Sequence, residues 1–183
     1  MPMKPNAKEK IYVAIILLLI AVCFQFYYTY RYQPAHEIEV YYNQEHALNS
    51  EIVNEIRDAD KFVYFAVYTF TRLDIAQALL AAKYRGLTVV GLTDKSQYSQ
   101  LDQQKKLIDE LKNNGIPVYT QDHLAIMHLK VLVTDKAYAS GSFNWTSAAT
   151  NLNDEVLEIG RDENIRQKYQ NILEEMFRRY GKQ

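Results

Sequence analysis

The chain has 183 residues, of which 21 are basic and 22 acidic, and its formal net charge is −1 at neutral pH. This length suits one domain with an appendage. Three lysines and one glutamate precede the first apolar run, so the rest of the chain carries a net charge of −3. A protein that binds polyanions mainly through nonspecific attraction to phosphate is usually basic. Any polyanion site in this chain must therefore be confined to a small part of its surface. The single cysteine, Cys23, excludes an internal disulfide and a thiolate metal site.

Residues 11–30 form an apolar stretch without a charged side chain. At about 1.5 Å per residue a helix of this length is roughly 30 Å long, the thickness of a bilayer core. Lysines precede the stretch, and aromatic residues gather at its C-terminal end as they do at a membrane interface. We therefore predict that residues 1–30 are a signal-anchor with one transmembrane helix. The lysine-rich side is expected in the cytoplasm and the following domain on the extracytoplasmic side, periplasmic or at the cell surface in a bacterium.

A cleaved signal peptide is the alternative, because the run from Ile11 to Phe24 also fits the apolar core of such a peptide. The domain would then be secreted. Bulky aromatic residues follow the run where a cleavage site needs small ones, and Val22 is a poor residue before a lipid-attached cysteine. Residues 31–37, with Pro34, are predicted to be a linker, and residues 38–183 a catalytic domain.

The domain alternates predicted strands and helices. Strands are expected at residues 38–43, 61–70, 87–94, 116–122, 129–135, 137–143 and 154–160, several of them apolar on both faces. Helices are expected at residues 49–60, 73–86 and 98–115, and over the apolar stripe from Ile165 to Tyr180. The pattern predicts an α/β fold, a β-sheet flanked by helices on both faces, preceded by one N-terminal transmembrane helix.

Local signals place several boundaries of these elements. Asn49 and Ser50 are predicted to cap the first helix, and Thr71 with Asp74 to form a capping box at the second. Gly86 and Gly115 are suited to end helices, the former in a left-handed conformation. A tight turn is expected near residues 135–137.

The segment from Met127 to Thr146, MHLKVLVTDKAYASGSFNWT, holds the candidate site. Alternate residues of an extended chain face the same way, so His128 projects with Lys130, and Ser142 with Asn144. If the two strands are neighbours, an imidazole, an ammonium, a hydroxyl and an amide converge. This set suits an anionic phosphoryl group, because the donors hold its oxygens while the imidazole attacks phosphorus or carries a proton.

Two further residues of the segment have a structural interpretation. Asp135 is an odd number of positions from His128 and is predicted to face away, as a turn residue. Gly141 permits close backbone approach beside Ser142. The other histidines, His36, His46 and His123, are interpreted as ordinary structural groups.

The spacing His128-x-Lys130, four residues, Asp135, then Gly141-Ser142 and Asn144, resembles the HKD motif of the phospholipase D superfamily. The ending GSFNWT is similar to the single-motif branch, which includes small bacterial endonucleases and mitochondrial cardiolipin hydrolase-like proteins. The segments YTFT, IAQALLAAKYRG, DKSQ and GIPV extend the resemblance over residues 38–180. It implies the phospholipase D-like fold with a mixed sheet.

The resemblance also implies a metal-independent phosphodiesterase, without a cofactor, that works through a covalent phosphohistidine. Glu155 matches the acidic active-site position of the branch, with Asp154 and Glu158 as competitors, and would fix the tautomer of the imidazole. No second His-x-Lys occurs in the chain, so a homodimer is expected, with two copies of His128 facing across a two-fold axis.

Three hypotheses for the substrate remain open. An endonuclease is favoured by the branch resemblance and by basic residues that could line a groove or simply be solvated: Lys61, Arg72, Lys83, Arg85 and Lys95. A phospholipase D acting on membrane phospholipids such as cardiolipin or phosphatidylcholine is favoured by the predicted anchor at residues 11–30. A membrane-tethered binding module with a dead site is the third. The sequence does not choose between DNA and RNA.

Overall fold

The computed structural model describes residues 6–31 and 38–182. The chain divides into two units, Met1–His36 and Glu37–Gln183. The first contains helix α1 (Ala7–Arg31), and the predicted linker at residues 31–37 lies almost wholly outside the described residues. Within α1, Ala7–Thr29 is long and apolar enough to cross a membrane, a property that it shares with signal sequences.

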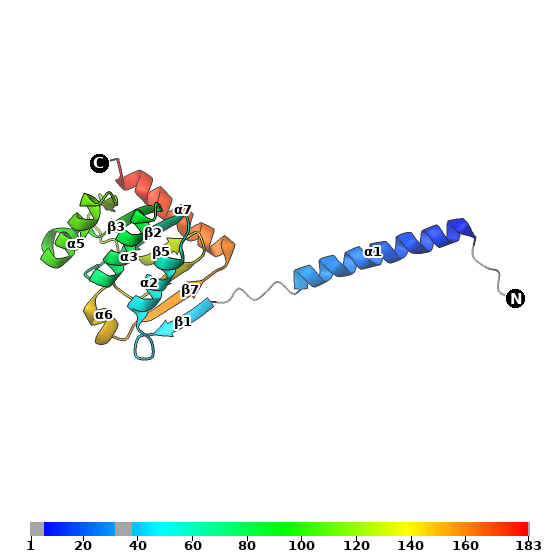
Figure 1. The fold of residues 1–183 in the computed structure, drawn as a ribbon, viewed down its shortest axis with the longest axis horizontal. Coiled ribbons are helices and arrows are strands. Elements are labelled where there is room, and N and C mark those ends of the chain that lie inside the picture. The colour runs from blue at the N-terminus through cyan, green and yellow to red at the C-terminus, as the bar shows by residue number, and fades with distance from the viewer. Residues whose placement is uncertain (1–5, 32–37, 183) are drawn as a thin grey trace. The chain divides into compact units, whose positions relative to one another are not determined.

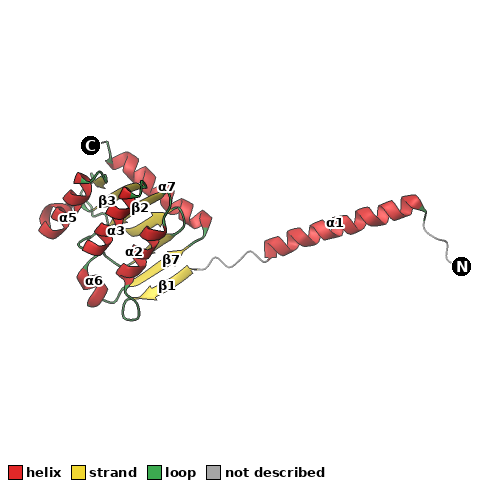
Figure 2. Ribbon diagram, in the orientation of Figure 1, coloured by secondary structure: helices red, strands yellow, loops and turns green. Residues whose placement is uncertain are grey.

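The second unit contains a seven-stranded mixed sheet with helices on both faces, as predicted (Figure 2). Its strands are β1 (Ile38–Tyr42), β2 (Phe62–Val67), β3 (Thr88–Thr93), β4 (Val118–Thr120), β5 (Lys130–Thr134), β6 (Tyr138–Gly141) and β7 (Val156–Gly160). Its helices are α2 (Leu48–Asp58), α3 (Leu73–Tyr84), α4 (Lys95–Gln100), α5 (Asp102–Asn113), α6 (Ser147–Asn151) and α7 (Glu163–Tyr180). The strand order is β1-β7-β6-β5-β2-β3-β4. β2, β3 and β4 run parallel to one another, and the other neighbours are antiparallel.

Two apolar layers hold the sheet between the helices. On one face α2, α3 and α5 pack on the strands through fully buried residues such as Ile52, Leu79 and Ile108. On the other face α7 packs through Leu173, and Phe177 meets the ring of Tyr64 edge to face with centroids 5.4 Å apart. Figure 1 shows α2 and α3 across one face of the strands and α7 across the other. Burial on both faces explains the nearly continuous apolar runs in the sequence.

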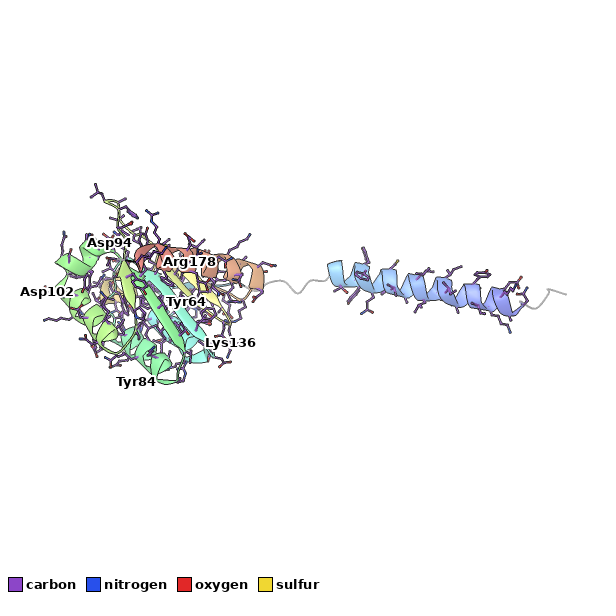
Figure 3. All side chains as sticks on the ribbon, turned by 90° about the horizontal axis from the view of Figure 1, so that it is seen from above. Tyr64, Tyr84, Asp94, Asp102, Lys136 and Arg178 are labelled. Carbon is purple, nitrogen blue, oxygen red and sulfur yellow. The ribbon has the colours of Figure 1, made fainter. Side chains whose placement is uncertain are left out.

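The strand register brings five strand ends together. Val67 at the end of β2 lies opposite Lys130 at the start of β5 and beside Thr93 at the end of β3. Gly141 at the end of β6 lies opposite Leu157 near the start of β7. The C-terminal ends of β2, β3 and β6 and the N-terminal ends of β5 and β7 therefore share one end of the sheet. In Figure 3, the labelled Asp94 marks this end and Lys136 the opposite one.

Several predicted boundaries are wrong. Helix α2 begins at Leu48, so Asn49 and Ser50 lie inside it and neither caps it. Helix α3 has no capping box: the carboxylate of Asp74 binds the guanidinium of Arg72 at 2.6 Å and the amide of Asn49 at 2.6 Å instead. Asn49 and Asp74 therefore bond to each other, from α2 to α3, instead of capping their own helices.

The single helix predicted at residues 98–115 is two helices. Asp94 caps α4 with side-chain bonds to the backbone N–H groups of Ser96 and Gln97, so the helix starts before the predicted boundary. Leu101 is extended and separates α4 from α5. Gly86 and Gly115 do adopt left-handed conformations, with φ of +90° and +78°, at the ends of α3 and α5. The short α6 was not predicted.

Candidate active site

The predicted site residues lie at the shared end of the sheet, in the segments that flank the strands. His128 stands in the loop before β5, whereas Lys130 is the first residue of the strand. Ser142 and Asn144 follow the last residue of β6, so they are not strand residues as the alternation suggested. Strands β5 and β6 are antiparallel neighbours, and this pairing is what brings the two halves of the motif to one place.

His128 and Lys130 are in direct contact. The ammonium nitrogen Nζ of Lys130 is 3.0 Å from Nε2 of His128 and donates to the backbone carbonyl of His128, also at 3.0 Å. The imidazole is exposed, whereas Lys130 is only 8% exposed. Tyr68, just beyond β2, closes one side of the pair: its ring centroid is 4.8 Å from that of His128 and 5.4 Å from Nζ of Lys130. The pair therefore presents an accessible nitrogen nucleophile beside a sheltered positive charge.

The electrostatics of Lys130 link it to the other half of the site. Burial lowers the pKa of the Lys130 ammonium below its ordinary value, while the negative charge of Glu155 opposes that shift. A carboxylate that raises the pKa of a lysine lies close enough to it to stabilise its charged form. Glu155 thus helps keep a positive charge at the place where a phosphoryl group would need one.

Glu155 and Ser142 form the second contact of the site. The hydroxyl of Ser142 donates a short hydrogen bond to Oε2 of Glu155, and the amide of Asn153 donates to Oε1 at 3.0 Å. The backbone N–H of Glu155 donates to Oδ1 of Asn43 at 3.1 Å. Glu155 is 8% exposed, and a buried carboxylate is tolerated only with partners of this kind. Its two competitors are placed differently: Asp154 accepts from the hydroxyl of Tyr42, and Glu158 is exposed on β7.

In the described part of the chain, the carboxylate of Glu155 bonds Ser142 and Asn153 rather than His128. The expectation that it fixes the tautomer of the imidazole therefore has no contact within one chain to support it. Its electrostatic influence on Lys130 is the connection that the structure provides.

Asn144 faces the segment that leaves β2. Its side-chain oxygen Oδ1 accepts from the backbone N–H of Thr69 at 3.3 Å, which leaves its amide hydrogens free to be donated elsewhere. The next residue, Trp145, is 1% exposed, and its backbone N–H donates to the carbonyl of Thr69 at 3.0 Å. The buried indole of Trp145 anchors the GSFNWT loop in the core. The preceding residue, Asn144, stays partly exposed.

Asp135 and Gly141 serve the backbone. Asp135 lies in the turn at the far end of β5, and its Oδ1 accepts from the backbone N–H groups of Asp60 at 3.0 Å and Lys61 at 3.1 Å. Burial alone would raise the pKa of Asp135, but these donors bring it below its ordinary value. A Cβ atom at Gly141 would lie 2.2 Å from the carbonyl oxygen of Val156. Only glycine allows β6 and β7 to approach this closely beside Ser142.

The five basic residues that could have lined a groove do not gather. Lys61, Lys83 and Arg85 lie toward the far end of the sheet, and the guanidinium of Arg85 donates to the carbonyls of Ile56 and Ala59. Arg72 pairs with Asp74. Lys95 is at the end of the sheet that carries His128.

Sequence reasoning missed three contributors to the site, Tyr68, Gln97 and Asp94. The amide of Gln97 donates to the hydroxyl of Tyr68 at 3.2 Å, and its oxygen accepts from the hydroxyl of Thr69 at 3.1 Å. Asp94 holds the loop that leads to His128, because its Oδ2 accepts from the backbone N–H of Met127 at 2.9 Å. The segments YTFT and DKSQ contain or adjoin these residues, but their spacing gives no reason to expect them beside His128. Among residues 6–31 and 38–182, no cluster of three or more His, Cys, Asp or Glu could hold a metal ion.

Comparison with known proteins places the chain in a family. The family model described as cardiolipin synthase, PLD-like domain, matches residues 52–177. A phospholipase D of Rickettsia conorii is 34% identical over 119 residues, which cover 64% of this chain and 58% of the relative. A mitochondrial cardiolipin hydrolase of Xenopus tropicalis is 31% identical over 123 residues, 67% of this chain and 57% of the relative. The chain therefore spans less than two thirds of the length of these curated relatives.

Solved structures match over a larger share of their length. A phospholipase D family member, Nuc from Salmonella typhimurium, superposes with a TM-score of 0.71 and 28% identity, covering 76% of this chain and 92% of that one. NucT from Helicobacter pylori superposes with a TM-score of 0.67 and 28% identity, covering 78% of this chain and 97% of that one.

The chain belongs to the phospholipase D superfamily. The predicted fold class and the predicted family, with its single-motif branch, are confirmed. The curated relatives named above are hydrolases by name, which agrees with the prediction of a superfamily hydrolase.

Proposed function

We propose that this protein is a metal-independent phosphodiesterase that works through a phosphohistidine intermediate on His128, and that its substrate is a nucleic acid. The observation that carries the proposal is the contact of an exposed imidazole nitrogen with a sheltered ammonium, 3.0 Å apart, in a chain of the phospholipase D superfamily. The imidazole supplies a nucleophile, and the ammonium supplies charge for the phosphoryl oxygens.

The proposed reaction has two displacements at phosphorus. When substrate binds, the ammonium of Lys130 passes from Nε2 of His128 to a phosphoryl oxygen, which frees the lone pair of that nitrogen. Nε2 then attacks the phosphorus atom, a P–N bond forms, and the bond from phosphorus to the leaving oxygen breaks. A second imidazole gives its proton to that oxygen. The same imidazole then takes a proton from water, which attacks phosphorus and breaks the P–N bond. Lys130 and Asn144 hold the phosphoryl oxygens in both steps, and the charge of Glu155 keeps Lys130 in its ammonium form.

The second imidazole comes from a second copy of the chain. One chain carries one His-x-Lys, so the proposed enzyme is a homodimer with the two copies of His128 facing across a two-fold axis. The remaining described histidines support this assignment. The ring of His46 packs on Tyr41 with centroids 5.3 Å apart, and the ring of His123 on Tyr180 with centroids 6.2 Å apart. His36 lies outside the described residues.

The surroundings of His128 support a polar polymer as substrate. The loop that leads to His128 lines a pocket of about 310 Å³, together with the start of α4. Its lining is mixed: besides the fully buried Asp94, the polar residues are Lys95, Ser96, Ser99, Gln100, Gln121, Asp122 and His123, and the apolar ones are Leu124, Ala125 and Ile126. A lining that offers both hydrogen-bonding groups and apolar surface suits a nucleotide beside the scissile phosphate. Tyr68 adds an aromatic ring next to the imidazole, a surface on which a base can stack.

A phospholipid substrate is the second candidate, and two observations favour it. The apolar helix α1 would hold the domain at a membrane, and the loop before His128 exposes Leu124 completely and Ile126 by 55%. In this account α1 is a single-pass anchor, and the second unit works on the extracytoplasmic side. The same proposal divides the chain into a membrane anchor at residues 1–30, a linker at residues 31–37 and a catalytic domain at residues 38–183.

A direct assay separates these substrates. The full chain, purified in detergent with EDTA, is offered plasmid DNA, single-stranded DNA, RNA, and mixed micelles of cardiolipin or phosphatidylcholine. We expect cleavage of nucleic acid that is lost in His128→Ala and retained in the matched control His46→Ala, whose ring packs on Tyr41 and does not line the pocket. Cleavage of the micellar lipid alone would establish the second candidate. Loss of activity in EDTA, or full activity of His128→Ala, would overturn the proposed mechanism, and phosphate binding without cleavage would leave a binding module.

A further inference from the structure

Asp94 is a fully buried carboxylate that lies outside the motif but is bonded on both of its oxygens. Oδ1 accepts from the backbone N–H groups of Ser96 at 2.9 Å and Gln97 at 3.0 Å, and from the Ser96 hydroxyl, and so caps α4. Oδ2 accepts from two groups far along the chain, the amide of Gln121 at 2.7 Å and the backbone N–H of Met127 at 2.9 Å. A helix cap needs only the first oxygen. The second oxygen instead accepts hydrogen bonds from the loop that ends at His128.

The first arm from Asp94 reaches the backbone of His128. Met127 is 3% exposed and immediately precedes His128, so the bond to its N–H fixes the chain one residue before the imidazole. Gln121 reinforces the start of the same loop. Its amide also donates to the carbonyl of Ala125 at 3.2 Å, and its oxygen accepts from the backbone N–H of Lys95 at 2.9 Å.

The second arm reaches the ring of His128. The cap on α4 fixes Gln97, whose amide donates to the hydroxyl of Tyr68 and whose oxygen accepts from the hydroxyl of Thr69. The Tyr68 ring in turn stands edge-on to the imidazole, with centroids 4.8 Å apart. One carboxylate therefore holds both the main chain and the ring face of the same histidine.

We propose that Asp94 is a positioning residue for His128, which holds the imidazole aimed at the phosphorus atom before substrate binds. This inference rests on the proposed function, because it gives the aim of His128 a role in a displacement at phosphorus. A nucleophile gains rate when it is held in the geometry of attack, and a misplacement of about 1 Å costs up to ~100-fold. The negative charge on Asp94 suits a group that only accepts hydrogen bonds. Burial would raise its pKa, but the donors around it bring the pKa below its ordinary value, so the carboxylate accepts from all five donors at neutral pH.

Asp94→Asn tests the first arm without changing the size of the side chain. The amide keeps one carbonyl oxygen, which can still cap α4, but it replaces Oδ2 with a donor that meets the amide of Gln121 and the N–H of Met127. Asp162→Asn is the matched control. Asp162 is 6% exposed, caps α7 through a 2.8 Å bond from the N–H of Ile165, and lies past the end of β7 that is remote from His128.

We expect Asp94→Asn to lower kcat ~10–100-fold with little change in KM, because substrate binding does not need the aim of the imidazole. Asp162→Asn should lower thermal stability and leave kcat within about twofold of the wild type. Adding Gln121→Glu to Asp94→Asn supplies an acceptor for the new amide and should restore part of kcat. If Asp94→Asn keeps wild-type kcat, or if both aspartate variants lose kcat in proportion to their unfolded fraction, the inference is wrong.

Two measurements keep the test decisive. Gln97→Ala removes only the arm to the ring, on a partly exposed residue, so it tests the idea even if Asp94→Asn does not fold; unchanged kcat in that variant would contradict the second arm. If the wild type cleaves neither nucleic acid nor lipid, the proposed function fails, and the ring ¹H–¹⁵N resonances of His128 still report on Asp94. These resonances should shift or broaden in Asp94→Asn and not in Asp162→Asn, and unchanged resonances in both would overturn the positioning role.

Discussion

Replacement of Gly141 by alanine is a test of how tightly the site is built. The new Cβ would lie 2.2 Å from the carbonyl oxygen of Val156 and 3.1 Å from its carbonyl carbon, whereas ordinary contacts are 3.4–4 Å. Strands β6 and β7 would therefore have to separate by about 1 Å beside Ser142. Overpacking of this kind costs ~1–3 kcal/mol.

The separation also strains two hydrogen bonds, from the N–H of Ser142 to the carbonyl of Val156 and from the N–H of Val156 to the hydroxyl of Ser142, both 3.1 Å. Each is worth ~0.5–1.5 kcal/mol, so the free energy of unfolding should fall by ~2–6 kcal/mol in all. At this chain length that loss lowers Tm by ~5–20 °C. The folded protein, assayed well below Tm, should also lose activity, because Ser142 and Glu155 move apart.

Thermal unfolding followed by circular dichroism, with activity measured well below Tm, checks this prediction. Gly86→Ala is the control: its φ is +90° and no atom lies within 4 Å of the added Cβ. That variant should lose only ~1–2 kcal/mol from the left-handed conformation and keep its activity. If Gly141→Ala is as stable as the wild type, or loses no more activity than Gly86→Ala, the close approach of β6 and β7 does not have the assigned role.

Three further predictions concern charged residues. Lys130→Ala should abolish phosphodiester cleavage and leave the circular dichroism spectrum unchanged, because Lys130 stabilises the phosphoryl oxygens; a large fall in Tm would instead mark it as structural. Glu155→Gln should move the alkaline limb of the pH profile of kcat/KM to lower pH. The active form of Lys130 is the ammonium, and loss of the Glu155 charge removes the influence that opposes the lowering of its pKa by burial; an unmoved limb contradicts the assignment. Asp135→Ala removes the acceptor of two backbone N–H groups and should cost ~1–3 kcal/mol of unfolding free energy without changing kcat. Because the folded pKa of Asp135 is lowered, the charge-dependent part of this difference is present above pH ~4 and lost as the pH falls further, which denaturation at two pH values measures.

The sheet and its order of elements could be predicted because the strands are buried on both faces and therefore apolar throughout, as in the segment KFVYFAVYTF. Helix boundaries were less predictable, since a cap depends on where a polar side chain finds its best partner. Asp74 is the example: its spacing from Thr71 predicts a capping box, but Arg72 and Asn49 bind its carboxylate. Asn49 comes from a helix 25 residues earlier in the chain, and no local pattern reveals that contact.

The same distinction holds for the candidate site. Residues inside one segment, His128 and Lys130, are related by strand geometry, so their contact follows from a two-residue spacing. Tyr68 and Asp94 reach the site from the ends of β2 and β3, and only the register of the parallel pair beside β5 brings them there. Glu155 could be placed near Ser142 by resemblance, yet its bond to that hydroxyl rather than to His128 depends on the pairing of β6 with β7.

Mixing of wild-type and His128→Ala chains tests the shared site most directly. Chains are combined at a constant total concentration, allowed to exchange in detergent, and assayed for phosphodiester cleavage in EDTA. If each reaction needs an imidazole from both copies, activity follows the square of the wild-type fraction, and an equal mixture retains about one quarter of the wild-type activity. A linear dependence, with about one half of the activity in the equal mixture, would show that one chain completes the reaction alone and would contradict the two-copy mechanism.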